Sequence, residues 1–192
     1  MTPTRWLVPA VLLLAACGVP MQSTPAPIDP EVVPTVLRSP QQPATPATAV
    51  PGMPAVQVDF VRNDRLVGLL REAPSTAQTD RIDTVIQALQ AGPNETEQAN
   101  GITSALPDGL QLSVAEIQGT RVVLELGGET EGRSSTENVL AVGQIVLSFT
   151  ALPSIDQVTF QRGGVPVETL LADGALTTEP LTAGDYASLR AR

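Results

Sequence analysis

Residues 134–160 constrain the fold more than any other stretch, because a marked helix start, an apolar helix and a strand follow one another without a break. Ser134 and Glu137 have the spacing of a capping box, in which each side chain satisfies a free backbone N–H group of the first helical turn. Pro153 cannot continue a helix, and the alternating strand of Val158 and Phe160 follows it. Apolar side chains lie on several faces of the helix, so we predict that it is almost entirely buried: Val139, Leu140, Val142, Ile145, Val146, Leu147 and Phe149, with Gly143 among them.

Residues 1–16 are typical of a bacterial lipoprotein signal peptide. A short start with one positive charge, at Arg5, precedes an apolar run over residues 6–14. That run is too short for a transmembrane helix, which needs about 20 residues. Leu14-Ala15-Ala16-Cys17 then resembles a bacterial lipobox. The alternative is an ordinary signal peptide followed by a chance cysteine, but Cys17 is the only cysteine and stands at the required position.

The lipobox resemblance implies cleavage before Cys17, a diacylglycerol group on its sulfur and usually an acyl group on the new N-terminus. Two or three acyl chains anchor a protein stably, whereas one holds it only marginally. We therefore predict an extracytoplasmic protein whose lipidated Cys17 lies in the cell membrane. A single cysteine also excludes an internal disulfide and a cysteine-rich metal site.

Residues 17–54 predict a disordered linker that begins at the lipidated cysteine. Ten prolines fall between Gly18 and Pro54, a stretch of 37 residues that is otherwise rich in Ala, Thr and Gln. Such a segment cannot bury enough apolar surface to offset its ordering entropy. Proline keeps it extended at about 3.1 Å per residue, so it could reach on the order of 100 Å from the membrane.

The charge of the chain argues against nucleic acid as a partner. The whole chain has a formal charge of −9, and loss of residues 1–16 removes Arg5 and leaves ten arginines against twenty acids, or −10. A nucleic-acid-binding protein needs a basic face, and none is visible. Every cation is arginine, which favours a GC-rich, actinobacterial source. Trp6 is lost with the signal, so the core of the domain must be largely aliphatic.

Residues 55–192 have the length of one domain and predict an α+β fold. A helix is expected over residues 79–91, with Gly92-Pro93 ending it, a short helix or turn over 94–100, and a closing helical turn after Leu181. Strands are expected over residues 56–60, 66–71, 102–106, 110–117, 121–126, 157–161 and 165–170. Hairpins with two long amphipathic helices predict a single two-layer sandwich, in which two main helices pack on an antiparallel or mixed sheet.

Three stretches of this domain carry a family resemblance. They are Leu89-x-x-Gly92-Pro93-x-x-x-Glu97, the run from Gly101 to Gly109, and Gln144–Pro153 leading to Val158-Thr159-Phe160 and Gly164-x-Pro166-Val167. Together they resemble the GerMN (sporulation and spore germination) domain over roughly residues 56–190. The shared positions are caps, turns and core residues. The resemblance implies a non-enzymatic module of bacterial lipoproteins and extracytoplasmic sporulation proteins, with no catalytic residues to carry over.

The composition excludes the commonest catalytic sites. The chain has no histidine and no lysine, and its one cysteine is predicted to be lipidated. Ser-His, Cys-His and Ser-Lys nucleophile pairs are therefore impossible, as are zinc sites of the usual type. We predict that the protein is not an enzyme, uses no cofactor and holds no metal ion.

Carboxylate pairs are the remaining catalytic option. Glu125, Glu129 and Glu131 cluster near a Gly-Gly pair, and Asp80 and Asp83 share one helix. Such pairs serve glycosidases, and the glutamate cluster could bind calcium weakly, although it lacks an EF-hand pattern. We interpret both groups as solvated surface acids, because glycan cleavage also needs aromatic platforms, of which this domain has almost none.

Two binding functions remain. The polar loop over residues 93–100 could contact a partner, although most loops of this kind are solvated connections. We predict a scaffold module that binds envelope proteins, and the alternative is a carrier of a small ligand or lipid. An internal apolar cavity of several hundred Å³ would favour the carrier, whereas a solid core would favour the protein-binding module.

Overall fold

The computed structural model describes residues 52–128 and 133–191. The predicted signal peptide, Cys17 and all but the last three residues of the predicted linker lie outside this part of the chain. Within it, no helix has the length and hydropathy needed to cross a membrane.

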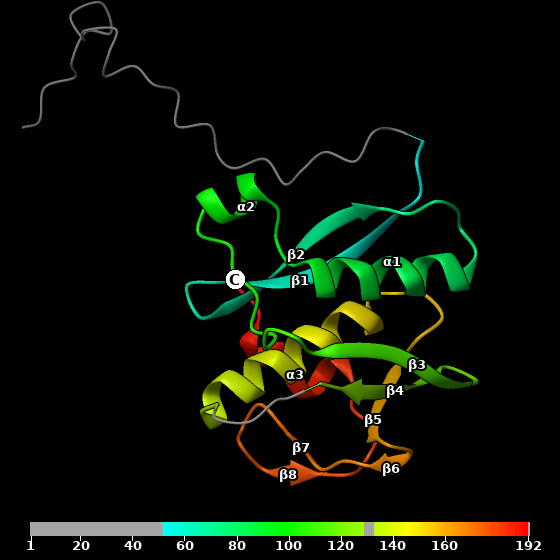
Figure 1. The fold of residues 1–192 in the computed structure, drawn as a ribbon, viewed down its shortest axis with the longest axis vertical. Coiled ribbons are helices and arrows are strands. Elements are labelled where there is room, and N and C mark those ends of the chain that lie inside the picture. The colour runs from blue at the N-terminus through cyan, green and yellow to red at the C-terminus, as the bar shows by residue number, and fades with distance from the viewer. Residues whose placement is uncertain (1–51, 129–132, 192) are drawn as a thin grey trace, which may run out of the picture. The chain divides into compact units, whose positions relative to one another are not determined.

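Runs of strands alternate with one or two helices along the described domain (Figure 1). In chain order they are β1 (Ala55–Arg62), β2 (Arg65–Glu72), α1 (Gln78–Ala91), α2 (Glu95–Ala99), β3 (Gln111–Gln118), β4 (Arg121–Gly127), α3 (Ser135–Thr150), β5 (Gln157–Arg162), β6 (Val165–Pro166), β7 (Thr169–Leu170), β8 (Leu176–Thr177) and the 3₁₀ helix η2 (Ala183–Leu189).

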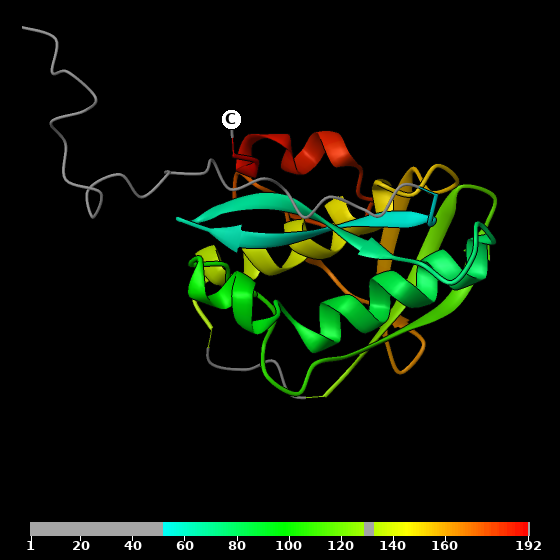
Figure 2. The same cartoon turned by 90° about the horizontal axis from the view of Figure 1, so that it is seen from above.

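Among the described residues the strands form three sheets around α3. β1 and β2 make an antiparallel hairpin, β3-β4-β5-β6 is a mixed sheet in which only β4 and β5 are parallel, and β7 pairs with β8. α3 connects the two parallel strands and contacts the hairpin, β5, β7 and η2 (Figures 1 and 2). The predicted α+β class, with a mixed sheet and two main helices, is confirmed. The structure adds that the hairpin is a separate sheet.

The N-terminus of α3 has the predicted capping box. The Glu137 N–H donates to Ser134 Oγ at 3.3 Å, and the Ser134 N–H donates to Glu137 Oε2 at 2.9 Å. Bonds from the Ser134 backbone and hydroxyl lower the pKa of the Glu137 carboxyl. As predicted, most of the helix is buried, namely Val139, Leu140, Ala141, Gly143, Gln144, Ile145, Val146, Leu147, Ser148 and Phe149.

Two of these buried residues are polar, and they tie α3 to its neighbours. Gln144 Oε1 accepts from the Ala105 N–H at 2.7 Å, and Gln144 Nε2 donates to Ser104 Oγ at 3.2 Å. Ser148 Oγ donates to the Gln144 carbonyl at 2.7 Å and accepts from the Asp59 N–H of β1 at 2.8 Å. Because these buried groups have no access to water, each of these hydrogen bonds replaces a hydrogen bond to water that burial removed.

Two predicted strands differ from the structure. Residues 165–170, expected as one strand, form β6 and β7 in different sheets. Pairing with β5 continues for one backbone bond beyond Pro166, from the Val167 N–H to the Phe160 carbonyl at 3.0 Å, and the chain then turns to pair with β8. Residues 102–106, expected to be extended, make only a bridge between Thr103 and Val61.

Residues 181–191, here called the C-terminal clasp, join elements that are far apart in sequence. Leu181 exchanges two backbone hydrogen bonds with Val158 of β5, at 2.8 and 2.9 Å. Tyr186 is fully buried and its hydroxyl donates to the Leu170 carbonyl at 2.7 Å. At the end of the clasp, the Ala191 N–H donates to the Leu66 carbonyl of β2 at 2.9 Å.

Tyr186 should report the docking of the clasp, because it is the only tyrosine in the chain. Burial, and secondarily the charge of Asp185, raise the pKa of its phenol. We expect the folded chain to show no phenolate absorbance as the pH passes about 10, where free tyrosine ionises. Since the folded state holds this proton more tightly than the unfolded state, the free energy of unfolding should fall as the pH rises above that value. A phenolate titration that matches the same chain in denaturant would contradict a buried Tyr186.

Candidate functional site

A groove of about 320 Å³ lies between α3, the β4–β5 part of the mixed sheet and the β6–β8 strands. Its residues are Pro107, Leu110, Leu126, Asn138, Ala141, Val142, Ile145, Phe160, Arg162, Val167, Glu168, Thr169, Leu170 and Leu176. Most of these side chains are apolar, so the groove has a hydrophobic floor. It is open to the surface.

The spacing of residues on α3 explains one wall of the groove. Asn138, Ala141, Val142 and Ile145 follow the i, i+3, i+4, i+7 pattern and therefore line one helix face. On this face, Ala141 and Ile145 are buried in the core, whereas Val142 is half-buried and borders the groove. Across the groove, Leu126 and Phe160 project from β4 and β5.

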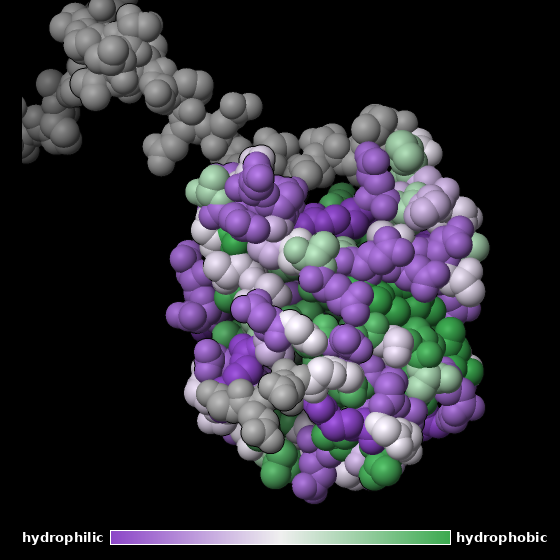
Figure 3. All heavy atoms as spheres, in the orientation of Figure 1, coloured by the Kyte–Doolittle hydropathy of each residue, from purple (hydrophilic) through white to green (hydrophobic). Residues whose placement is uncertain are grey.

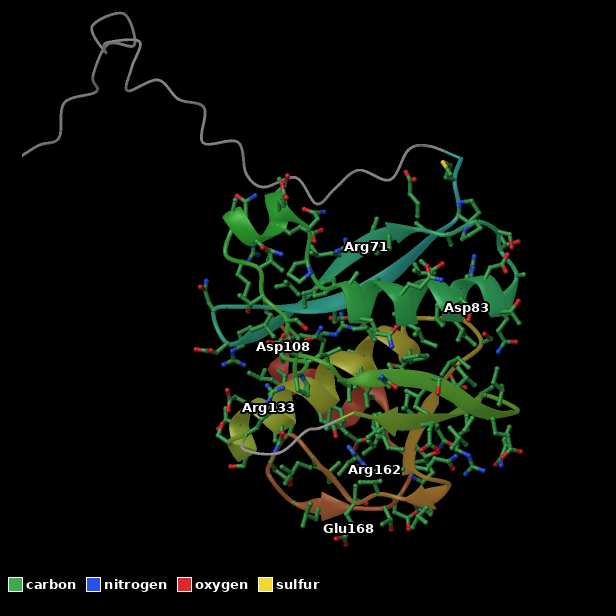
Figure 4. All side chains as sticks on the ribbon, viewed as in Figure 1. Arg71, Asp83, Asp108, Arg133, Arg162 and Glu168 are labelled. Atoms are coloured by element: carbon green, nitrogen blue, oxygen red, sulfur yellow. The ribbon has the colours of Figure 1, made fainter. Side chains whose placement is uncertain are left out.

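Charged groups stand around this apolar floor. Arg162 of β5 and Glu168, just before β7, belong to its described lining, and Figure 4 shows both on the side of β5 and β7. Arg162 Nη1 donates to the Gly128 carbonyl at 2.8 Å. At the lip, Leu176 of β8 keeps 62% of its surface exposed. The groove therefore combines an apolar floor with a polar rim, as surfaces that bind other molecules commonly do.

A second depression, of about 290 Å³, lies beyond the turn of Pro107 to Leu110, which borders both depressions. Two of the stretches that carry the family resemblance meet there. Gly92 and Pro93 come from the end of α1, whereas Ser104, Leu106, Pro107 and Gly109 come from the segment before β3. Gly92 and Gly109 have φ of 74° and 81°, the left-handed region that favours glycine. The motif glycines therefore shape these two turns.

Of the predicted acidic cluster, Glu125 lies in β4, and Glu129 and Glu131 lie outside the described residues. Glu125 accepts from Gln161 Nε2 at 2.9 Å and from the N–H groups of Gly163 and Gly164. Partial burial raises the pKa of this carboxyl, but these bonds and the charge of Arg162 outweigh it and leave the pKa below its usual value. Glu125 thus braces the β5–β6 turn.

The second predicted acidic pair lies on α1. Asp80 accepts from the Ser75 hydroxyl just before the helix, whereas Asp83 is exposed (Figure 4). Neither residue borders the groove. Over residues 52–128 and 133–191, no three acidic side chains come together in a way that could hold a metal ion.

The predicted contact loop over residues 93–100 is an ordered element. Asn94 and Glu97 cap α2 reciprocally, with both bonds at 2.9 Å. Glu97 also accepts two bonds from the Arg71 guanidinium of β2, at 2.7 and 2.8 Å, and that guanidinium lies 5.0 Å from the centre of the Phe60 ring. α2 is therefore held against the hairpin.

The described residues of the groove include no nucleophile beside a base. Among its described lining residues, only Arg162 and Glu168 have charged side chains. Sequence patterns alone could not have found this groove, because its lining comes from six separate segments of the chain. The one signal was Leu176, an apolar residue outside every predicted element, and it lies at the lip.

Hydrophobic surface also gathers elsewhere on the domain. In Figure 3 it lies below the place of α1, on the side of the mixed sheet. Val114 of β3 and Ile86 of α1 are partly buried and pack against the same core. This surface lies along the seam between α1 and the mixed sheet.

Comparison with known proteins gives a family match. A model of the Germane family, described as sporulation and spore germination, matches residues 54–168. The match ends at residue 168, whereas the predicted resemblance ran to about residue 190. A search of curated proteins gave no match.

Solved structures agree in fold. The first GerMN domain of the sporulation protein GerM from Bacillus subtilis has a TM-score of 0.54 at 14% identity and covers 68% of this chain and 98% of that one. The tandem GerMN domains of GerM give 0.53 at 17% identity and cover 74% of this chain and 50% of that one. This chain therefore spans half the length of the tandem structure. At such identities the likeness concerns the fold alone.

Proposed function

Because this chain belongs to the Germane family of sporulation and spore germination domains, we propose that it is a membrane-anchored extracytoplasmic lipoprotein whose domain binds another envelope protein without catalysis. The observation that carries the binding role is the groove with its apolar floor, polar rim and exposed lip. The anchor rests on the lipobox around Cys17. The linker gives the domain its reach from the membrane.

The lip of the groove favours a protein segment as the occupant. Leu176 is 62% exposed at the edge of the groove, and a small molecule lying inside would leave most of that side chain in water. An extended segment that crosses the lip would cover it and could place an aliphatic side chain on the floor near Val142 and Phe160. Burial of that kind stabilises a complex by roughly 25 cal/mol per Å² of apolar surface.

The second candidate function is that of a carrier of a small apolar ligand. The observation in its favour is the groove volume of about 320 Å³, which lies at the lower end of the usual range for ligand sites. Against a lipid, the groove is open to the surface, so long acyl chains would remain in contact with water. Lipid extraction of the purified protein distinguishes the two functions.

Leu176→Asp should abolish partner capture while leaving the fold intact. A carboxylate at the lip would have to be desolvated when the partner segment covers it, which costs several kcal/mol. The measurement is in-cell crosslinking followed by mass spectrometry of the captured proteins. Val165→Asp is the matched control, because Val165 is 64% exposed on β6 and does not line the groove. Equal capture by both variants would rule out the groove as the binding surface, and capture of lipid alone by the unaltered chain would favour the carrier.

Cys17→Ala should release the protein from the membrane fraction or leave it mislocalised, because the acyl chains would have no attachment point. Cell fractionation and metabolic labelling with a fatty acid measure the two effects. Ser23→Ala, a change in the same segment that leaves Cys17 in place, should have no effect. Membrane retention and normal labelling of the Cys17→Ala chain would contradict lipidation at this residue.

A further inference from the structure

β7 and β8 form one wall of the groove, and they are a separate two-stranded sheet. Leu170 and Leu176 are cross-strand partners in this sheet, and both line the groove. In Figure 1 the sheet lies below α3, whereas the β1–β2 hairpin lies above that helix. Because β7 and β8 pair with no other described strand, the position of this wall depends on the contacts that join it to the rest of the domain.

The wall is tied to the domain at three points. Backbone hydrogen bonds to β5 hold its two ends, from the Val167 N–H before β7 and at Leu181 after β8. Between these ends, among the described residues, a single hydrogen bond joins residues 169–179 to another element. It runs from the Tyr186 hydroxyl to the Leu170 carbonyl and measures 2.7 Å. One side chain of the C-terminal clasp therefore holds the middle of the wall.

The register of β7 and β8 explains why this carbonyl is available. The Leu171 N–H donates to the Ala175 carbonyl at 2.8 Å, so the next pair along, Leu170 and Leu176, exchanges no backbone bonds. The Leu170 carbonyl is thus directed away from β8. A buried tyrosine hydroxyl needs a hydrogen-bond partner, and this carbonyl supplies one. Since a phenylalanine ring would fill the same space, the hydroxyl contributes the link to β7 rather than the packing.

The ring of Tyr186 packs on the helix that forms the facing wall. A Cβ atom at Gly143 would lie 3.0 Å from Tyr186 Cδ1, so the ring lies directly against α3 at this position. The neighbouring residue, Val142, lines the groove. Tyr186 is fully buried and is not among the described lining residues. It therefore connects both walls, α3 through its ring and β7 through its hydroxyl, without entering the groove.

We propose that Tyr186 is a positioning residue for partner binding, which fixes β7 relative to α3 so that the docked clasp sets the width of the groove. This inference rests on the proposed function of the groove as a binding surface. β7, β8 and the clasp all lie beyond residue 168, where the family match ends. Because coupling between two sites is reciprocal, a partner segment in the groove should in turn hold the clasp more firmly in place.

Amide hydrogen exchange measures the hold on the wall without any partner. The full chain is purified with Cys17→Ser, which removes the lipidation site, and is compared with the same chain carrying Tyr186→Phe. The N–H groups of Leu171 and Gly174 are bonded within the β7–β8 turn. Without the hydroxyl they should exchange about two- to ten-fold faster, the range expected for the loss of one hydrogen bond. Unchanged exchange in α3 would show that the rest of the fold is intact.

Arg65→Gln is the matched control for loosening the clasp. Arg65 donates to the Ser188 carbonyl at 2.7 Å, so the change also removes one hydrogen bond to the clasp, but that bond does not reach β7. The exchange of Leu171 and Gly174 should stay at the native rate in this chain. Equal exchange of these two amides in the Tyr186→Phe chain and the native chain would overturn the positioning role.

In-cell crosslinking, with Cys17 intact, tests the consequence for binding. The native and Arg65→Gln chains should capture the same envelope protein to the same extent, whereas capture by Tyr186→Phe should fall by about two- to ten-fold. Equal capture by all three chains would overturn the positioning role and leave the groove as a binding surface. If the native chain captures no protein, the proposed function fails, and the exchange rates still decide whether Tyr186 holds the wall.

Discussion

The Gly143→Leu chain is expected to be less stable than the native chain by about 3 kcal/mol, the upper end of the usual range for overpacking a core. A Cβ atom at Gly143 would lie 2.9 Å from Leu189 Cδ1, 3.0 Å from Tyr186 Cδ1 and 3.1 Å from Leu66 Cδ1. A leucine extends three atoms further into the same space, so α3 and η2 must separate. The clasp should loosen with them, and Tyr186 should gain solvent contact.

Denaturant unfolding followed by circular dichroism measures this loss, and the tyrosine titration shows whether the clasp has moved. Gln87→Leu on the exposed face of α1 is the control for adding a leucine to a helix, and it should change the stability by less than about 0.5 kcal/mol. The loss of stability caused by Gly143→Ala should lie between those caused by Gly143→Leu and Gln87→Leu, because a gain in helix propensity of about 1 kcal/mol offsets part of the crowding. An unchanged midpoint for Gly143→Leu would show that η2 does not pack tightly on α3.

Arg190→Gln is the second change for which we expect a large loss, of about 2 kcal/mol near neutral pH. Arg190 Nη2 lies 3.3 Å from Asp59 Oδ2, and the Asp59 side chain is fully buried. Without the arginine, that carboxylate keeps only the bond from Gln57 Nε2 at 3.1 Å, and Asp59 Oδ1 has no partner in the described structure. Removing one member of a buried pair costs about 3–5 kcal/mol, and we expect less here because Arg190 is 39% exposed.

The pH dependence of this loss identifies its cause. Burial raises the pKa of the Asp59 carboxyl, against the lowering effects of Gln57 and Arg190. The folded state therefore holds the proton more tightly than the unfolded state, and stability falls as the pH rises from about 3.8 through the raised pKa. Removing Arg190 raises that pKa further. The Arg190→Gln deficit should accordingly be small in acid and reach its full size near neutral pH.

Asp59→Asn should restore most of the stability of the Arg190→Gln chain, because no buried charge is then left alone. Arg65→Gln is the matched control, since Arg65 donates to the Ser188 carbonyl of the same clasp at 2.7 Å but faces no buried carboxylate. It should cost no more than about 1 kcal/mol. A pH-independent deficit for Arg190→Gln, or no rescue by Asp59→Asn, would contradict a role in compensating the charge of Asp59.

The packing at Gly143 and the Asp59–Arg190 pair both show that the folded domain extends beyond residue 168, where the family match ends. Residues 169–191 follow the matched region, yet they contribute Tyr186, Leu181 and Leu189 to the packing around α3 and supply Arg190 to Asp59. The mixed sheet and the hairpin otherwise meet through α3 and α1. The clasp is therefore an integral part of this fold.

Local sequence patterns determined much of the architecture. The capping box at Ser134, the apolar faces of α3, the stripe of α1 and the Gly92-Pro93 stop all depend on residues a few positions apart, whose interactions form within one helix. The alternation along β1, β4 and β5 is equally local. The lipobox at Cys17 is also read directly from the sequence, and the lipidation it predicts is tested by the Cys17→Ala experiment.

Only the tertiary structure decided which elements became partners. It paired Asp59 with Arg190 across 131 positions and placed Gln144 against Ala105. It also set Leu176 beside α3 and divided residues 165–170 between two sheets. None of these contacts leaves a periodic signature, because each joins segments whose separation along the chain bears no relation to their distance in space. The groove depends on such contacts, and for that reason the sequence alone predicted a binding module but not its surface.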